Sequence, residues 1–401
     1  MLVLETNKLK RKKTPFYFYD IDLLRETLSI AKTEAERYGF RVHYALKANA
    51  NERILSEIHH YGFGADCVSG NEVLSAIAAG FKPSSVVLAG VGKSDEEIKI
   101  ALENDIFCFN SESLEELQVI NEIALSMGKT ARIALRINPN VDAQTHHYIT
   151  TGINISKFGI LESDLPEVIA ELKRLPALTF VGLHFHVGSQ ITNLDVFREL
   201  CDAINHIQTT YFSENGFIPS FINVGGGLGV DYEDPYSNPI PPLADYFKIF
   251  HQNLKLKPGQ AVHFELGRAL VANCGLLISK ILYTKKSSEK HFMILDAGMT
   301  ELIRPALYQA HHQIQNITRI NAPLEQEYDV VGPICESSDC FGTDINLPVS
   351  HRGDLVAIHS AGAYGEVMSS QYNLRTKVKS YYSDTIGEKT HPVSLPLEQN
   401  I

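Results

Sequence analysis

Two periodicities of apolar residues alternate along most of the chain. Short apolar runs, which suit strands, are separated by longer segments in which apolar residues recur three or four positions apart, as in amphipathic helices. The runs predict eight strands, at 41–49, 64–69, 85–90, 106–111, 131–139, 178–190, 221–227 and 261–268. A helical pattern precedes each strand, beginning with 23–39 ahead of the first. Two of these helices begin with the S-x-x-E spacing of a capping box, at Ser69 with Glu72 and at Ser94 with Glu97.

This alternation predicts an α/β fold with a parallel sheet. Eight units over about 240 residues match a (β/α)₈ barrel of the TIM type. A doubly wound open sheet is the alternative, because periodicity does not establish closure. After residue 269 the pattern changes to short β-rich segments separated by turns, which predicts a mostly β second domain. We expect a barrel over 20–262 and a β-rich domain over 263–401, to which 1–19 add a strand through the segment FYFY.

Composition narrows the class of protein. The 401-residue chain has a net charge of −11, which does not favour nonspecific binding to nucleic acids. Its six cysteines are scattered without a C-x-x-C pair, so we expect neither a disulfide framework nor a zinc site. No apolar run has the length of a membrane span, and no apolar leader follows the basic cluster at 8–13, which we interpret as a solvated tail. These features predict a cytoplasmic protein that binds neither membranes nor nucleic acids.

The expected strand ends carry many polar residues. The run RVHYALKAN includes Lys47 at its tip, and lysine is rarely buried without a partner. An isolated lysine there would most simply reach solvent, whereas a lysine with a lowered pKa can form a Schiff base. Active sites of barrels lie where strands end, so the residues at the other strand ends decide between these two interpretations of Lys47. They carry Asp66, Asn110, Arg136, Asn138, His186, Ser189, Gly225, Gly226, Gly227, Glu265 and Arg268.

The three glycines at 225–227 have two interpretations. A glycine run is most often a tight turn, but after the seventh strand of a barrel its N–H groups can also bind a phosphate. The stretch does not have the glycine spacing of a dinucleotide site, and the chain has no P-loop motif. No HExxH motif occurs and the histidine pairs are adjacent, so no metal site is predicted. A lysine, a phosphate site and an acidic residue together suit pyridoxal phosphate.

Several motifs then point to one family. The segments HYALKAN, HFHVGSQ, NVGGGLG, FELGR, CES and GAYGEVM occur in an order and spacing that resembles the group IV pyridoxal-phosphate decarboxylases. That group shares a barrel and a β-domain with alanine racemase. The stretch MTELIRPALYQAHH (299–312) resembles the diaminopimelate decarboxylases in particular, and the resemblance extends from residue 16 to residue 375. It implies decarboxylation of meso-2,6-diaminopimelate to L-lysine and carbon dioxide, the last step of lysine biosynthesis.

The resemblance also implies roles at the cofactor. Lys47 would form the Schiff base, His186 would stack on the cofactor ring, and Glu265 would pair with the ring nitrogen. Asp66 would lie near the Schiff base, and Arg268 would border both cofactor and substrate. The phosphate contacts would be Ser189, Gly225, Gly226, Gly227 and Tyr364.

At the substrate, the resemblance implies a site shared between two subunits of a homodimer. Arg268, Arg304 and Tyr308 would hold the distal carboxylate, with Tyr364 beside them. Cys335 would return a proton to the substrate carbon after decarboxylation. Glu336 would bind the distal ammonium group from across the dimer interface.

Three other functions stay open on the sequence alone. The chain could decarboxylate another basic amino acid, such as ornithine, arginine or lysine. It could be a racemase, although a carboxylate at Glu265 strengthens the electron sink that decarboxylation needs, where alanine racemase has an arginine. It could be a noncatalytic binding protein, which would be expected to lose Lys47 or Cys335, and both are present.

Overall fold

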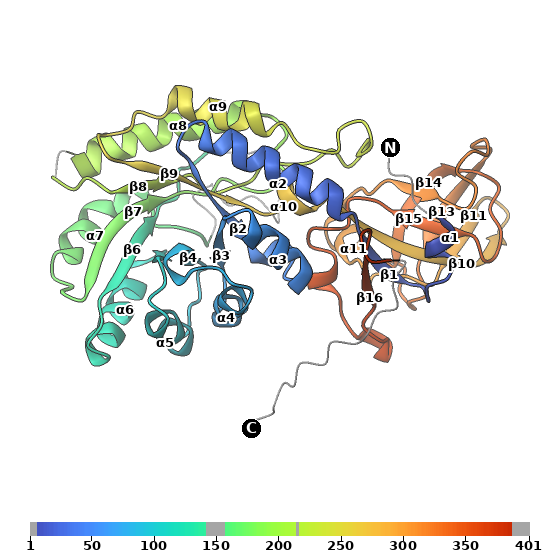
Figure 1. Cartoon of the computed structure of the whole chain (residues 1–401), viewed down its shortest axis with the longest axis horizontal. Coiled ribbons are helices and arrows are strands. Elements are labelled where there is room, and N and C mark those ends of the chain that lie inside the picture. The colour runs from blue at the N-terminus through green and yellow to red at the C-terminus, as the bar shows by residue number, and fades with distance from the viewer. Residues whose placement is uncertain (1–5, 142–156, 214–215, 387–401) are drawn as a thin grey trace.

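The computed structural model describes residues 6–141, 157–213 and 216–386, and its two parts lie side by side along the long axis (Figure 1). One part is a closed barrel of parallel strands in sequence order. The barrel closes where β2 pairs with β9, which places His43 opposite Glu265. The barrel strands are β2 Arg41–Ala45, β3 Gly64–Cys67, β4 Val86–Leu88, β5 Cys108–Ser111, β6 Ala131–Arg136, β7 Leu178–His184, β8 Phe221–Asn223 and β9 Ala261–Leu266. The predicted (β/α)₈ barrel is confirmed, and the open sheet is excluded.

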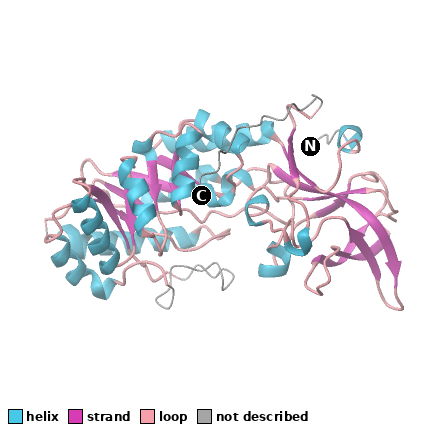
Figure 2. Cartoon of the chain, turned by 90° about the horizontal axis from the view of Figure 1, so that it is seen from below, coloured by secondary structure: helices cyan, strands magenta, loops and turns pink. Residues whose placement is uncertain are grey.

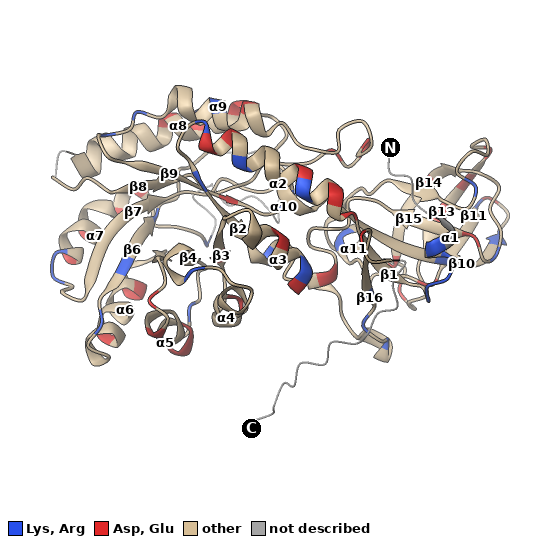
Figure 3. Ribbon diagram, viewed as in Figure 1, with Lys and Arg blue, Asp and Glu red and all other residues tan. Residues whose placement is uncertain are grey.

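Helices cover the outside of the barrel, each with one apolar face against the strands. They are α2 Ile21–Glu36, α3 Glu52–His60, α4 Gly70–Ala78, α5 Asp95–Glu103, α6 Leu114–Ser126, α7 Leu165–Leu172, α8 Asp195–Ile207 and α9 Leu243–Asn253. In α8, for example, Phe197, Leu200 and Ile204 are buried at helical spacing. Acidic and basic residues are interspersed along α2 and α3 rather than separated by sign (Figure 3). No described helix is long and apolar enough to cross a membrane.

The two predicted capping boxes have different outcomes. At Ser94 the box is complete, because Ser94 Oγ accepts from the Glu97 N–H and the Glu97 carboxylate accepts from the Ser94 N–H. At Ser69, Oγ accepts from the Glu72 N–H at 3.2 Å. The Glu72 carboxylate, however, accepts from the Val68 N–H at 2.7 Å, one residue before the cap. The helix start at Ser69 is therefore confirmed, but the full capping box there is wrong.

The second part is mostly β structure. Its strands follow the order β12-β15-β10-β11-β13-β14, and β1 joins them by pairing with both β10 and β16. The FYFY segment thus contributes the expected strand, β1 Phe16–Tyr19. Most helices surround the barrel, away from these strands (Figure 2). The other elements are α1 Thr6–Leu9, α10 Arg268–Val271, β10 Gly275–Lys286, β11 His291–Leu295, α11 Arg304–Tyr308, β12 Ile314–Asn316, β13 Gln326–Val331, β14 Cys340–Leu347, β15 Leu355–Ile358 and β16 Lys379–Tyr382.

The last barrel strand extends past the expected domain boundary. β9 pairs with β2 as far as Leu266, so a division between residues 262 and 263 falls inside this strand. Strand β10, which begins at Gly275, belongs to the second sheet. We therefore propose that the boundary lies between α10 and β10, with β1 assigned to the second domain.

Candidate active site

A cavity of about 200 Å³ lies where the carboxyl ends of the barrel strands meet the β-domain. It is lined by nine of the residues predicted from the sequence, namely Lys47, His186, Ser189, Gly227, Glu265, Arg268, Arg304, Tyr308 and Tyr364. The barrel supplies the first six of these, and the two ends of α11 supply Arg304 and Tyr308. Tyr364 reaches the cavity because its N–H donates to the Ala48 carbonyl at 2.8 Å, next to Lys47.

Lys47 follows the strand rather than ending it. β2 ends at Ala45, and Lys47 lies in a 3₁₀ turn, from which its accessible surface faces the cavity. Burial acts to lower the pKa of Lys47, but the negative charge of Asp66, with smaller contributions from Tyr364 and Glu265, raises it overall. Schiff-base formation led us to expect a lowered pKa of Lys47, and that expectation is wrong for this structure. The pKa is raised because the neighbouring carboxylate favours the ammonium form of the lysine.

Asp66 supplies most of that charge. It lies on β3 next to Ala45 of β2 and is 1% exposed. Neither of its carboxylate oxygens has a hydrogen-bond partner among the described residues. Burial raises the pKa of Asp66 well above its usual value, the Glu265 charge adds to this, and Lys47 opposes it. A buried carboxylate without partners is costly, which is typical of a site completed by a ligand.

Glu265 has a different environment, because three side chains donate to it. Its Oε1 accepts from Asn110 Nδ2 at 2.9 Å and from Asn223 Nδ2 at 2.7 Å, and its Oε2 accepts from His184 Nε2 at 3.0 Å. Burial acts to raise the pKa of Glu265, but His184 and then Lys47 outweigh it and hold the pKa below its usual value. A carboxylate offers about four lone pairs, so one acceptor position stays available for a ligand N–H.

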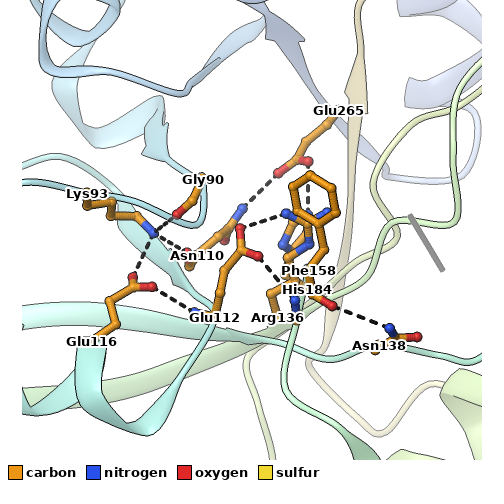
Figure 4. A network of polar contacts seen from close by, with 11 residues as sticks. Gly90, Lys93, Asn110, Glu112, Glu116, Arg136, Asn138, Phe158, His184 and Glu265 are labelled. Carbon is orange, nitrogen blue, oxygen red and sulfur yellow. Dashed lines mark hydrogen bonds and ion pairs between the residues drawn. The ribbon is translucent and has the colours of Figure 1, made fainter. Parts of the chain in front are cut away.

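A buried ion pair fixes one of these donors. Lys93 Nζ donates to the Asn110 carbonyl and to Glu116 Oε1, both at 2.7 Å, and its side chain is 2% exposed. Figure 4 shows this pair beside Glu265 and Asn110, together with the ion pair of Arg136 and Glu112 at 2.7 Å. The Glu265 carboxylate is therefore held by a network that reaches the loops after β4 and β5.

His186 is a half-buried, neutral imidazole. Its pKa lies well below the usual value, first because of burial and then because of the positive charges of Lys47 and Arg136. The Gly226 N–H donates to its Nδ1 at 3.3 Å. An uncharged ring fixed at the cavity wall suits stacking on an aromatic cofactor.

The glycines are required by the backbone itself. A Cβ on Gly225 would lie 2.3 Å from the Phe185 carbonyl, and one on Gly226 would lie 2.0 Å from the Glu265 carbonyl. Gly225 and Gly227 also have φ values of 72° and 100°, which disfavour other residues. Gly227 lines the cavity, whereas Gly225 and Gly226 do not. The run therefore brings backbone close to the cavity through Gly227, and phosphate binding by its N–H groups stays a prediction.

Two buried arginines lie together at the outer side of the cavity. Arg268 donates from Nη1 to the Tyr232 hydroxyl at 2.6 Å and from Nη2 to Ser189 Oγ at 2.9 Å. Arg304 lies over the Tyr232 ring at 4.8 Å and donates from Nη1 to His312 Nε2 at 2.8 Å. No carboxylate of the described chain is among the leading influences on the pKa of either guanidinium. Two buried cations without an anion indicate an anion-binding site.

Cys335 and Glu336 do not line this cavity. Both are exposed, in a loop held by the buried Asp339, whose carboxylate accepts from the N–H groups of Met299 and Ile334 at 2.6 Å. One chain therefore brings together the lysine, the imidazole, the carboxylate and the arginines, but not the predicted proton donor or its neighbour.

Several side chains that shape the site are not among the residues predicted from the sequence. His184 and Asn223 hold Glu265, and Tyr232 and His312 contact Arg304. The sequence does carry a signal for His184. Alternate residues of a strand share a face, so an extended HFH segment would place His184 on the same side as His186. For Tyr232, in a loop, the sequence carries no such signal.

The residues of this cavity suit pyridoxal phosphate. They offer a lysine, a neutral imidazole, a carboxylate with one free acceptor position and buried donors for an anion, while the Asp66 oxygens have no partner among the residues that the structure describes. Residues 22–272 match the family model described as "Pyridoxal-dependent decarboxylase, pyridoxal binding domain". Fold, site and family model together define a pyridoxal-phosphate-dependent amino-acid decarboxylase.

The similar proteins are more specific. A diaminopimelate decarboxylase of Bacteroides thetaiotaomicron is 52% identical over 95% of this chain and 98% of its own. The crystal structure of diaminopimelate decarboxylase from Helicobacter pylori complexed with L-lysine is 42% identical, with a TM-score of 0.88 over 94% of this chain and 93% of that one. The chain therefore belongs to the diaminopimelate decarboxylase family. An arginine decarboxylase from Paramecium bursaria Chlorella virus, at 21% identity and a TM-score of 0.83, shares the fold alone.

Proposed function

We propose that this protein decarboxylates meso-2,6-diaminopimelate to L-lysine and carbon dioxide, with pyridoxal phosphate held at Lys47. One observation carries the choice of substrate. The cavity that holds Lys47 and Glu265 also holds Arg268 and Arg304, two buried cations for which no carboxylate of the described chain is a leading influence on the pKa. A substrate with a second carboxylate would supply the missing anion.

The residues at the inner side of the cavity would hold the cofactor. Lys47 is the amine for its aldehyde, His186 would lie against its ring, and the free acceptor position of Glu265 would receive the ring N–H. Ser189 and the N–H groups of the 225–227 turn would bind its phosphate, with Tyr364 and Arg268 beside them. Bound pyridoxal phosphate supplies an electron sink for the electron pair that remains when a carboxylate leaves as carbon dioxide.

The protein's own contribution to the reaction is electrostatic. Glu265 keeps a fixed negative charge at the innermost position, where a protonated ring nitrogen makes the sink strongest. Asp66 lies beside Lys47 and raises the lysine pKa, so it favours the ammonium form of a lysine that is not attached to the cofactor. Charge that develops only in the transition state is stabilised selectively by such preorganised groups.

The outer side of the cavity would bind the end of the substrate that does not react. That end carries a carboxylate and an ammonium group. Arg304, Arg268 and Tyr308 would bind the carboxylate, and the guanidinium groups can do so through paired hydrogen bonds. Glu336 of a second copy of the chain would bind the ammonium group.

We also propose a homodimer with shared active sites. Cys335 and Glu336 are exposed and lie outside the cavity of their own chain, so a partner chain would have to supply them. Carbon dioxide loss leaves a carbon that needs one proton, and Cys335 of the partner would provide it. The six cysteines are free thiols, which fits the cytoplasmic location that we infer for the protein.

Subunit complementation tests the shared site. Lys47→Ala and Cys335→Ala are each expected to be inactive alone. When the two variants are mixed under conditions that exchange subunits, one site of each hybrid dimer has both wild-type residues. Partial recovery of activity is expected, and no recovery despite demonstrated exchange would show that each site is built from one chain.

Product analysis tests the reaction itself. The purified holoenzyme is incubated separately with meso-diaminopimelate, L-ornithine, L-arginine and L-lysine, and released carbon dioxide and amine are measured. Equal amounts of carbon dioxide and L-lysine from meso-diaminopimelate are expected. Faster release from one of the other three would replace the proposed function by the corresponding decarboxylase.

A further inference from the structure

Arg304 is held by an imidazole. Arg304 is 5% exposed, and its Nη1 donates to His312 Nε2 at 2.8 Å. His312 is itself 1% exposed, and its Nδ1 lies 2.8 Å from the His359 carbonyl oxygen. Buried arginines usually pair with carboxylates, so the neutral partner needs an explanation.

The two contacts of His312 determine its protonation state. The His359 carbonyl can only accept a hydrogen bond, so Nδ1 of His312 must carry the proton. Arg304 can only donate, so Nε2 of His312 must offer its lone pair. His312 is therefore a neutral imidazole with its proton on Nδ1. Its pKa lies well below the usual value, first because of burial and then because of the charge of Arg304.

A third residue completes the support of the guanidinium. Arg304 lies over the Tyr232 ring, and the His312 ring meets the same ring edge to face with centroids 5.1 Å apart. The Tyr232 hydroxyl accepts from Arg268, so one aromatic side chain contacts both cations. The plane of Arg304 is thus set by an aromatic face and by an acceptor, and neither of them carries a negative charge.

We propose that His312 is a positioning residue that orients Arg304 without neutralising it, and so keeps its charge available for the distal carboxylate of the substrate. The proposal rests on the function proposed above. An arginine has five N–H donors, and His312 uses one of them. A carboxylate at the same place would also orient Arg304, but it would compete with the substrate for the same charge. Residue 312 would then determine how tightly the distal carboxylate binds.

The reaction chemistry supplies a probe that needs no turnover. Decarboxylation removes one of the two carboxylates of meso-diaminopimelate, so L-lysine keeps the distal carboxylate and the distal amine. Cadaverine, 1,5-diaminopentane, is the same molecule without that carboxylate. Equilibrium binding of L-lysine and of cadaverine to the holoenzyme therefore separates the carboxylate contact from all other contacts.

An isosteric pair of variants tests the role of charge. Glutamine and glutamate can both place an oxygen near the Nε2 position of His312, and they differ in charge. His312→Gln is expected to bind L-lysine within a few-fold of the wild type, whereas His312→Glu is expected to bind it about ten- to hundredfold more weakly. Cadaverine affinity is expected to be nearly equal in the two variants. His311→Gln is the matched control, because His311 is exposed and its recorded ion pair is with Glu233.

Equal affinity of the two variants for L-lysine would overturn the proposal. A parallel loss of L-lysine and cadaverine binding would also overturn it, because it would indicate a merely structural role for His312. Folding of each variant is checked by its Lys47–cofactor absorbance. If His312→Glu does not fold, His312→Asn takes its place, since asparagine reaches only the Nδ1 position of the histidine and leaves Arg304 without its acceptor. L-lysine binding must then fall in His312→Asn, while cadaverine binding does not. If wild-type enzyme releases no carbon dioxide from meso-diaminopimelate, the proposed function fails independently of this result.

Discussion

The two ends of the barrel differ in whether their buried polar side chains have partners. Toward the amino ends of the strands, His43 and His263 satisfy each other, with 3.1 Å between Nε2 of His43 and Nδ1 of His263. Nδ1 of His43 also lies 3.1 Å from the Ser85 carbonyl oxygen. At the carboxyl ends, Asp66 has no hydrogen-bond partner in the described chain, and no carboxylate of that chain is among the leading influences on the pKa of Arg268.

Strand β9 contains one polar residue of each kind within three positions. His263 is paired and neutral, whereas Glu265 is ionised and keeps one acceptor position free. The difference indicates that one end of the barrel contributes stability and the other contributes chemistry, as is usual for this fold. Substitutions at the carboxyl end should therefore change activity more than stability, and substitutions at the amino end should do the reverse.

The largest effect is expected at Lys47. Lys47→Ala should lose the visible absorbance of the Lys47–cofactor adduct and lower activity by at least about 10⁴-fold, because it removes the covalent attachment. Borohydride reduction of the wild-type holoenzyme followed by peptide mapping should place the modification on Lys47. The control Lys99→Ala, at an exposed position on α5, should keep the absorbance. A label on any other lysine would contradict the assignment.

The next largest effect is expected at Arg304. Arg304→Lys should lower kcat/KM for meso-diaminopimelate by about 10²- to 10³-fold, because an ammonium group cannot reproduce the paired hydrogen bonds of a guanidinium. The Lys47–cofactor absorbance should stay unchanged, since Arg304 is in α11 at the outer side of the cavity. Wild-type kinetics in this variant would mean that the outer arginines do not bind the substrate.

A smaller effect is expected at His184, which donates to Glu265. His184→Leu should lower kcat by about 10- to 10²-fold with little change in KM, because the carboxylate loses its orientation while the outer side of the cavity is untouched. His184→Gln, which keeps a donor, should lose less. Nitrogen NMR of labelled cofactor should report altered protonation of the ring nitrogen in His184→Leu. A raised KM with an unchanged nitrogen signal would argue against this role.

At the amino end of the barrel the expected effect is on stability. Burial lowers the pKa of His263 to about 2 and also lowers the pKa of His43. As the pH falls through about 6.5, the unfolded chain takes up protons at these residues and the folded chain does not, so stability falls. Between pH 7 and pH 5, His263 should contribute a loss of about 2 kcal/mol in the free energy of unfolding.

Urea denaturation across this pH range measures that loss. His263→Gln removes one titrating group, so its free energy of unfolding should depend less on pH than that of the wild type. Its kcat/KM at pH 7 should lie within about twofold of the wild-type value, since the amino end of a barrel contributes to stability and lies away from the catalytic end. Identical pH dependence in the two proteins would show that His263 titrates normally in the folded state.

Much of the fold could be predicted, because its signals are local. Apolar periodicity located every barrel strand, and the S-x-x-E spacing placed the starts of α4 and α5. Strand ends were less well defined. The apolar run at 178–190 predicts a segment that is extended throughout, but β7 ends at His184, and Gln190 has a φ of 61°. Apolar residues continue past the last ladder hydrogen bond, so hydrophobicity alone does not mark where a strand stops.

The candidate site could be predicted only where single residues carry the chemistry. Lys47 and Glu265 were found because their charge is unusual beside apolar runs. The contact of Asn223 with Glu265 depends on barrel closure, which sequence spacing does not specify. The contact between Arg304 and His312 depends on the path of the segment between α11 and β12, where His312 lies against the His359 carbonyl. The raised pKa of Lys47 likewise depends on Asp66 of the neighbouring strand.

The central claim is that buried arginines select a substrate with a distal carboxylate. The most direct measurement compares kcat/KM of the wild-type holoenzyme for meso-diaminopimelate with that for L-lysine and L-ornithine as substrates. When either of these presents its α-carbon for decarboxylation, the distal end has no carboxylate and the arginine donors stay unpaired. A preference for meso-diaminopimelate on the order of 10⁴-fold is expected. Decarboxylation of L-lysine or L-ornithine with comparable kcat/KM would contradict the role assigned to Arg304.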